Sequence, residues 1–386
     1  MSAITKLVSD TKQANKTFYR TERLEAQTGN DSMKFNYNGI SQFSSIRNTA
    51  SSSTLDRLGF KSEGTNLNLR YQNNTIIADS LFGIKYNLSN FDLNKYGFNH
   101  VTSEKTMGLY QNNNASQLAI LTDGIYKNID FTVNTLDNQT SLLNALSGLN
   151  LTYFKRAPSQ LFDQDAKSLN QRVAKNVSNS NKDFVTITYR VIAPPHSQLY
   201  VSIPNISWSD DNNHSLSITV NGVTRNQVTD NTFDFFDLGY FETESMVTIK
   251  LSFPGNKAIS FDNPSFYALD TQNYQIAMDT INERDSKVTT SNNKVFVDYS
   301  SKTNASLFFT IPYDKGWTAT INHKKVKIHR AQKGFMKVDV PSGKGKVVLT
   351  FIPYGLKTGL LISLLASIIF CCYAYFIRKI TVIQNS

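Results

Sequence analysis

Cysteine is nearly absent from this sequence of 386 residues. Its two cysteines, Cys371 and Cys372, are adjacent and lie inside an apolar run near the C-terminus. We expect them to face lipid or to pack against neighbouring side chains rather than to form a disulfide bond. The rest of the chain contains no cysteine.

Motifs of the common catalytic and metal centres are also absent. The five histidines are scattered, none belongs to a His-Glu-x-x-His motif, and none has a cysteine partner, which argues against a zinc site. The sequence has no Gly-x-x-x-x-Gly-Lys-Ser/Thr loop and no Gly-x-Ser-x-Gly elbow, so nucleotide hydrolysis and serine-hydrolase chemistry are excluded. We identify no catalytic residue, no metal site and no cofactor.

One pair of acids has the Asp-x-Asp spacing with which many sugar-nucleotide transferases hold a divalent cation. Asp163 and Asp165 form this pair. They lie beside a polar stretch, residues 165–182, and two acids at this spacing occur readily by chance. We therefore interpret the pair as part of a solvated loop.

Formal charge is absent from a run of 20 residues near the C-terminus, residues 358–377. As a helix this run rises about 30 Å, which is the thickness of the hydrocarbon core of a bilayer. It is apolar on every face, unlike a helix that packs on a soluble core, and Arg378 and Lys379 follow it directly. The run predicts a transmembrane helix.

The orientation of this helix is harder to predict. Residues 1–20 contain no apolar segment of the kind found in a signal peptide. The chain is then either tail-anchored, with its bulk in the cytoplasm, or the C-terminal part of a longer protein with several spans. The two cations of residues 378–386 favour a cytoplasmic tail, since cytoplasmic flanks are enriched in Lys and Arg. We expect the bulk of the chain to be extracytoplasmic.

The pattern of apolar residues changes along the chain. Residues 1–165 mix strand-like and helical segments, which predicts an α+β domain. Residues 183–272 alternate with a period of two and are rich in β-branched and aromatic residues, which predicts a jelly-roll-like β-sandwich. Residues 285–355 repeat this pattern and predict a small basic β domain beside the membrane. The predicted fold is mainly β, with one transmembrane helix (358–377) and a tail (378–386).

Local signals place some helices and turns within these domains. We expect helices within residues 48–59, 74–83, 140–148 and 274–285. Residues 51–54 are candidate caps of the first helix, and Asn138 or Thr140 of the third, because a short oxygen-bearing side chain can accept from a first-turn N–H. Asn221-Gly222 is a strong hairpin signal, since both residues accept positive φ.

The sequence has two tryptophans, and we interpret them differently. Trp208 opens a polar turn with Asp210 and Asp211, so the three residues are a candidate glycan-binding platform. The alternative is that Trp208 belongs to the core or edge of the sandwich. Trp317 lies in a strand-rich block, and we expect it to anchor the core of the third domain. An acidic and aromatic run, residues 233–244, is interpreted as a strand and a charged turn.

Basic residues concentrate in the third domain. Nine Lys and Arg and one acid, Asp339, lie within residues 315–346, which places a net charge of +8 there out of +10 for the chain. An anionic surface is the natural partner, and lipid headgroups come first because the domain adjoins the span. The candidate contacts are Lys324, Lys325, Lys327, Arg330 and Lys333. The alternative is a solvated face with no specific partner. No base-stacking array accompanies the charge, so we expect no nucleic acid partner.

Several strings resemble the C-terminal part of the YfhO family of bacterial membrane proteins. These are DSLFGIKY (79–86), IPYDKGWTATINHKKVKI (311–328) and GFMKVDVPSGKGKVVLTFIPYGLKTG (334–359), and the resemblance is strongest over residues 308–359. It implies a GT-C-type glycosyltransferase that uses a lipid-linked sugar to decorate lipoteichoic acid or a related polymer outside the cell. Such proteins have many N-terminal spans, and their presumed catalytic carboxylate lies in an early extracytoplasmic loop.

None of those spans lies in this sequence, so no catalytic residue of the family can be placed on it. The resemblance implies that the chain is not catalytic by itself and that its partners are the bilayer and the multi-span portion of the enzyme. An undecaprenyl-phosphate-linked sugar and teichoic acid are further implied partners. The alternative function is a non-catalytic, membrane-anchored surface module that binds glycan or polyanion. The sequence leaves the sugar, the acceptor and the oligomeric state open.

Overall fold

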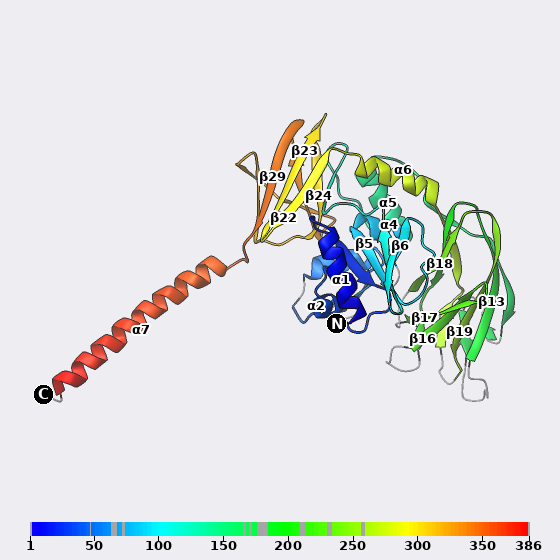
Figure 1. Cartoon of the computed structure of the whole chain (residues 1–386), viewed down its shortest axis with the longest axis horizontal. Coiled ribbons are helices and arrows are strands. Elements are labelled where there is room, and N and C mark those ends of the chain that lie inside the picture. The colour runs from blue at the N-terminus through cyan, green and yellow to red at the C-terminus, as the bar shows by residue number, and fades with distance from the viewer. Residues whose placement is uncertain are drawn as a thin grey trace.

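The computed structural model describes residues 2–46, 48–62, 68–71, 74–164, 167–169, 172–175, 184–208, 214–229, 234–255 and 259–384. Within these ranges the chain forms 29 strands and seven helices, which confirms the predicted mainly-β fold. Figure 1 shows the N-terminal region, in blue and cyan, between a green β-sandwich and a yellow and orange membrane-proximal region. A long C-terminal helix extends away from all three regions (Figure 1).

A four-stranded sheet forms the centre of the N-terminal region. Its order is β1 (Arg20–Arg23), β5 (Ile84–Ser89), β7 (Met107–Asn112) and β6 (Phe98–Glu104). Strand β1 runs parallel to β5, and the other neighbours are antiparallel. A smaller sheet contains β2 (Gln42–Phe43), β4 (Asn68–Arg70) and β3 (Lys61–Ser62). The helices of this region are α1 (Ala3–Ala14), α2 (Asp31–Phe35), α3 (Thr49–Asp56), α4 (Ile76–Leu81) and α5 (Thr135–Ser147). The α+β character predicted for this region is confirmed.

Three of these helices, α3, α4 and α5, overlap the predicted segments, but the caps of α3 and α5 differ from the predicted ones. The side chain of Asn48 caps α3 by accepting from Ser51 N, and Thr75 caps α4 by accepting from Ala78 N. Asn134 caps α5 by accepting from the N–H groups of Leu136 and Asp137. The helices α3 and α5 begin before the predicted cap positions, because an asparagine a few residues upstream already satisfies the first-turn N–H groups.

Three sheets build the β-sandwich. The first has the order β10 (Ser159–Gln164), β13 (Phe184–Ala193), β19 (Ser245–Pro254), β16 (His214–Val220) and β17 (Val223–Thr229). The second has the order β18 (Asp234–Phe241), β14 (Ser197–Ile203), β21 (Ser265–Asp270) and β9 (Phe154–Arg156). The third has the order β11 (Lys167–Leu169), β12 (Arg172–Lys175), β20 (Ile259–Asp262) and β15 (Ser207–Trp208). Alternate residues of the long strands fill one core, for example Val185, Ile187 and Val191 of β13.

Two sheets form the membrane-proximal region. One has the order β22 (Ser286–Ser291), β23 (Lys294–Ser301), β29 (Gly343–Phe351), β25 (Trp317–Ile321) and β26 (Lys324–Val326). The other has the order β27 (His329–Ala331), β28 (Phe335–Val340), β24 (Ala305–Pro312) and β8 (Ala119–Leu121). Trp317 is half-buried and packs on Phe351, with ring centroids 5.0 Å apart. Trp317 packs against the core of this region, as predicted, but is not fully buried, because it is the first residue of β25.

Segments from the first part of the chain cross into the later sheets. Strand β8 pairs with β24, and β9 and β10 join the sandwich. Helix α6 (Thr271–Asn282), which the sequence predicted, connects the sandwich to the membrane-proximal region and packs against α5. The guanidinium of Arg20 donates to the carbonyl of Phe82 and, at 2.7 Å, to that of Thr310. The three regions are therefore held together by strand pairing and buried hydrogen bonds.

Helix α7 (Leu356–Gln384) is long and apolar enough to cross a membrane. The most apolar stretch of its segment Leu356–Arg378 has a mean hydropathy of 2.4, and no part of that stretch is buried against the rest of the described chain. An exposed helix of this composition would not be stable in water, since it would leave a continuous apolar surface hydrated. The helix contains the predicted span and anchors the protein to the membrane.

Candidate functional site

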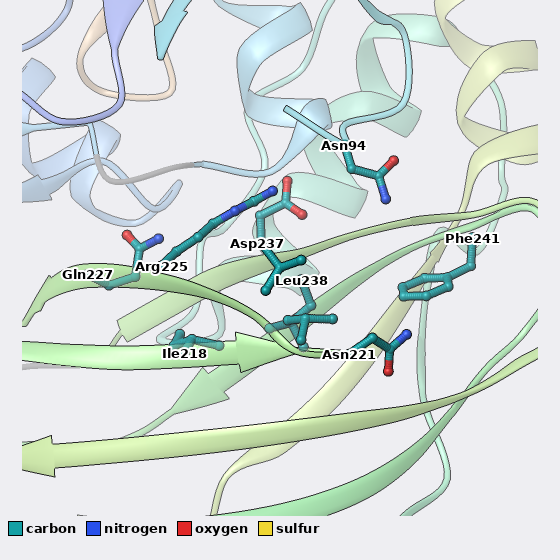
Figure 2. A pocket seen from close by; sticks show the side chains of 10 residues that line it. Asn94, Ile218, Asn221, Arg225, Gln227, Asp237, Leu238 and Phe241 are labelled. Atoms are coloured by element: carbon teal, nitrogen blue, oxygen red, sulfur yellow. The ribbon is translucent and has the colours of Figure 1, made fainter. Parts of the chain in front are cut away.

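A pocket of about 200 Å³ lies where the N-terminal region meets the β-sandwich. We call it the junction pocket. Its polar lining consists of Asn94, from the segment between β5 and β6, and of Asn221, Arg225, Gln227 and Asp237 from the sandwich. Ile218, Leu238 and Phe241 supply apolar surface (Figure 2). A concave site that combines apolar walls with a few convergent polar groups is the usual form of a small-ligand site.

Asp237 is the buried acid of the junction pocket, with an exposed fraction of 6%. Its Oδ1 accepts from Gln198 Nε2 at 2.6 Å and from Gly239 N at 2.7 Å. Its buried Oδ2 has no hydrogen-bond partner among the residues that the structure describes. Leaving a buried acceptor unpaired costs about 1–3 kcal/mol, so Oδ2 would gain from a further hydrogen-bond donor.

An irregularity of the sheet directs this carboxylate. The register between β14 and β18 shifts between Leu199 and Tyr200, because Leu199 pairs with Gly239 and Tyr200 with Asp237, which leaves Leu238 as an extra residue. Such β-bulges bend a strand and re-aim its side chains. In Figure 2 the carboxylate of Asp237 lies between the end of the Arg225 side chain and Asn94.

Charge and burial act in opposite directions on Asp237. Burial raises the pKa of the Asp237 carboxyl, while the cations Lys95 and Arg225 act to lower it. The guanidinium of Arg225 donates to the Asp92 carbonyl at 2.8 Å and stacks over the Phe91 ring at 4.4 Å from its centroid. Arginine carries five N–H donors in a fixed fork, so these contacts orient Arg225 and leave donor capacity beside the carboxylate.

Asn94 fixes the segment between β5 and β6 on the sandwich. Its Nδ2 donates to the Tyr240 carbonyl at 3.1 Å, and its own carbonyl accepts from Tyr240 N at 3.2 Å. Gly239 makes this approach possible, because its φ is +108° and a Cβ there would lie 2.9 Å from Asn94 Nδ2. The two walls of the junction pocket are thus joined by hydrogen bonds.

A fully buried ion pair lies near the junction pocket. Lys95 Nζ pairs with Asp79 Oδ2, and it also donates to Tyr71 Oη at 3.2 Å and to Asn87 Oδ1 at 3.3 Å. Burial raises the pKa of Asp79 to about 6, and the attraction of Lys95 opposes this rise. Both side chains of the pair are fully buried, which leaves them no contact with solvent. The pair therefore serves the structure, and Lys95 also offsets the charge of Asp237.

The structure places Trp208 inside the sandwich. Its exposed fraction is 5%, its indole N–H donates to Thr229 Oγ1 at 3.1 Å, and its ring packs near Phe253. Of the two interpretations of Trp208, the structure therefore supports a core residue of the sandwich. Asp210 and Asp211, the other two predicted platform residues, lie outside the described residues.

The other predicted acids and cations are spread over the surface. Asp163 is exposed on β10, Asp165 lies outside the described residues, and no group of three or more metal-ligating side chains occurs in the described ranges. Lys324 and Lys325 are exposed on β26, Lys327 follows that strand, and Lys333 is exposed in the turn between β27 and β28. The guanidinium of Arg330 lies over the Tyr313 ring at 4.4 Å from its centroid. The structure does not bring these cations to one point.

Sequence reasoning missed Asp237 and Arg225. Asp237 lies within residues 233–244, which the sequence analysis interpreted as a strand with a charged turn. A usable signal was present, because an acid between apolar residues of a buried strand is costly unless it is paired. No sequence signal indicated Arg225, which reaches the pocket only because β17 lies against residues 91–94.

Two solved structures show a distant likeness to this chain. A cycloisomaltooligosaccharide glucanotransferase of Paenibacillus sp. is 8% identical, with 55% of this chain and 50% of that chain covered and a TM-score of 0.21. A family two carbohydrate esterase from Cellvibrio japonicus is 13% identical, with 29% and 34% covered and a TM-score of 0.17. TM-scores this low carry no argument about this chain.

A comparison with protein families is more informative. Residues 1–363 match the family described as "Bacterial membrane protein YfhO". A curated relative, "Uncharacterized protein YfhO" of Bacillus subtilis (strain 168), is 25% identical over 135 residues, which is 33% of this chain and 16% of the relative. The aligned part thus spans well under half of that relative. Because the family match covers nearly the whole chain, this protein belongs to the YfhO family of bacterial membrane proteins.

Proposed function

We propose that this chain is the extracytoplasmic, glycan-binding part of a membrane glycosyltransferase that decorates lipoteichoic acid or a related envelope polymer from a lipid-linked sugar. Membership of the YfhO family and the apolar helix α7 support this proposal. In it, the catalytic centre lies in a multi-span membrane part outside this chain. The chain itself binds a sugar unit of the polymer and holds it near the membrane.

The buried, unpaired carboxylate oxygen of Asp237, a residue of the pocket lining, is the observation that carries the glycan-binding role. In the proposal, a small shift of the lining side chains lets a sugar hydroxyl donate to it. A sugar hydroxyl both donates and accepts, so a carboxylate oxygen beside an arginine and several amides provides matching partners. Leu238 and Phe241 provide apolar surface for the C–H face of a sugar ring. At about 200 Å³ the junction pocket is smaller than the roughly 300–1,000 Å³ of drug-sized sites, which suits one sugar unit rather than a chain.

Asp237→Asn tests this role, because the replacement keeps the shape and the Oδ1 acceptor but removes the charge. We expect binding of purified lipoteichoic acid to the full chain in neutral detergent, measured by calorimetry, to weaken at least tenfold, since a hydrogen bond to a charged group contributes about 1.5–3 kcal/mol. Asp163→Asn is the matched control. It removes an exposed carboxylate from β10, at the opposite edge of the same sheet from β17.

Equal affinity of Asp237→Asn and the wild-type chain, at equal melting temperature, would remove the junction pocket from the proposal. Loss of binding in both variants would show a general charge effect instead. The test requires that the Asp237→Asn variant folds. Thermal unfolding is therefore measured for the wild-type chain and for both variants.

Two further experiments test the wider proposal. A protease added to cells without a wall should digest the region before Thr358 and spare the segment after Arg378; protection of the large region would reverse the proposed orientation. The chain purified alone should transfer no sugar from undecaprenyl-phosphate donors, whereas membranes that also hold the multi-span part should. Glycan binding with no transfer in any combination would favour the alternative, a non-catalytic surface module.

A further inference from the structure

A second pocket, of about 220 Å³, lies where the membrane-proximal sheet meets α7. We call it the membrane-side pocket. Its polar lining consists of Lys315, Thr318, Tyr354, Lys357 and Thr358. Figure 1 shows that α7 leaves the region from the end of β29, so this pocket lies directly beside the start of the apolar helix.

The turn before β25 positions one wall of this pocket. Asp314 Oδ1 accepts from Gly316 N at 2.7 Å, and Ile352 N donates to the Gly316 carbonyl at 3.0 Å. A Cβ at Gly316 would lie 2.4 Å from the Ile352 carbonyl oxygen, so the two backbones can approach this closely only with glycine. The close approach holds Lys315 beside Tyr354, with Nζ at 5.7 Å from the ring centroid.

Charge and depth both suit the headgroup layer. Lys315 and Lys357 contribute two cations to the lining, and Asp314, the neighbouring acid, engages one of its carboxylate oxygens in the turn. The apolar segment begins at Leu356, so the pocket lies at the level where the chain enters the hydrocarbon core. Tyr354 is 79% exposed at this boundary, where amphipathic aromatic side chains are enriched.

The cations that the sequence singled out lie farther along the sheet. Trp317 pairs with Phe351, next to α7, whereas Ile321 pairs with Val347 and with Lys324. Trp317 and Ile321 are four steps apart along the strand, which is about 13 Å at 3.3 Å per residue. That distance exceeds the Debye length of about 10 Å at 0.1 M salt, so Lys324 acts weakly on a headgroup beside α7.

We propose that the membrane-side pocket binds the phosphate group of an anionic membrane lipid, with Lys315 and Lys357 as its cationic ligands. Thr318 and Thr358 supply hydroxyl donors, and Tyr354 lies at the rim. The occupant is a lipid rather than a free anion, because the pocket opens beside a membrane-spanning helix. This inference is independent of the glycan-binding role of the junction pocket.

The test compares two double variants of the full chain in neutral detergent. Lys315→Gln/Lys357→Gln removes two charges from the pocket, and Lys324→Gln/Lys325→Gln removes two exposed charges from β26. Binding of short-chain phosphatidylglycerol is measured by calorimetry, with phosphatidylcholine and inorganic phosphate as comparison ligands. We expect the first variant to bind phosphatidylglycerol about thirtyfold more weakly, since each nearby cation contributes about 1 kcal/mol, and the second less than threefold more weakly.

Three outcomes would overturn the proposal. These are unchanged affinity of Lys315→Gln/Lys357→Gln, an equal loss in both double variants, and equal binding of phosphatidylcholine by the wild-type chain. Inorganic phosphate that displaces phosphatidylglycerol at equal concentration would show a free-anion site and would overturn the assignment to lipid. Both variants should melt near the wild-type temperature, because exposed cations contribute little to stability.

Discussion

The N-terminal region and the membrane-proximal region hold their charges in opposite ways. In the N-terminal region, Glu22, Asp79 and Lys95 are buried and have defined partners. In the membrane-proximal region, Lys315, Lys324, Lys325, Lys344 and Lys357 are exposed. Buried charges cost several kcal/mol unless they are paired, whereas exposed charges cost almost nothing and depend on salt.

The contrast between buried and exposed charges indicates which charges stabilise the fold and which are available to bind a partner. A charge that is buried and paired is part of the structure, and its removal should appear as lost stability. A charge that is exposed should appear as altered binding at unchanged stability. The predictions below test this division, beginning with the largest expected effect.

Lys95→Met should cause the largest loss. The variant leaves the Asp79 carboxylate buried without its cation, which typically costs 3–5 kcal/mol. The control is Lys346→Met, which breaks an exposed pair with Asp298 at 3.6 Å and should cost less than about 1 kcal/mol. Urea unfolding of the two variants measures the contrast. Similar losses would show that burial does not set the cost of these pairs.

The two tryptophans allow the same comparison of a buried and a half-buried side chain for apolar packing. Trp208→Ala should destabilise the chain by about 3–5 kcal/mol, because it empties a buried position and removes the hydrogen bond from the indole N–H to Thr229 Oγ1. Trp317→Ala should cost clearly less, since Trp317 is half-buried and loses mainly its contact with Phe351. Denaturant titration of the two variants measures their losses in the free energy of unfolding. A larger loss at Trp317 would contradict the placement of both rings.

Glu22 should make stability depend on pH. Its carboxylate accepts from Ile40 N, from Ser41 N at 2.9 Å and from Ser41 Oγ at 2.9 Å, and burial raises its pKa to about 7. A raised folded-state pKa means that the folded chain binds the proton more tightly than the unfolded chain. The free energy of unfolding should therefore fall as the pH rises from about 4.5 to about 7, by about 3 kcal/mol for this group.

Glu22→Gln isolates this contribution. It keeps an acceptor for the two backbone N–H groups but cannot ionise, so its melting temperature should change less between pH 5 and pH 8 than that of the wild-type chain. Burial also raises the pKa of Asp79, to about 6. The stability of the variant should therefore still fall with rising pH, but less steeply. An identical pH profile in both proteins would exclude Glu22 as the source.

The smallest stability effect is expected for Lys324→Gln/Lys325→Gln/Lys327→Gln. All three side chains are exposed, so the melting temperature should stay nearly unchanged. Their contribution to vesicle binding should disappear as the salt concentration rises, because they lie along the sheet away from α7. Co-sedimentation of the chain with anionic vesicles over a salt series measures this. A large fall in melting temperature would place these cations among the structural charges.

Local patterns in the sequence determined the elements of this protein. The run 358–377 specifies an apolar helix by its composition alone. Alternation with a period of two gave the long strands such as β13, since one face of each must be buried. Asn221 and Gly222 adopt φ of +47° and +88° in the predicted hairpin, because these residue types tolerate positive φ with little strain. Each of these features depends on residues that are close in sequence.

Only the tertiary structure decided which of these elements meet. The pairing of β8 with β24, and the hydrogen bond of Arg20 to a carbonyl 290 residues away, follow from how the regions pack. The same holds for the burial of Asp237, whose free oxygen depends on a bulge in β18 and on the segment that Asn94 fixes against it. The physical reason is that burial and long-range pairing are properties of the assembled core. A neighbour in sequence can set a dihedral angle or a period, but it cannot specify which distant strand covers a carboxylate.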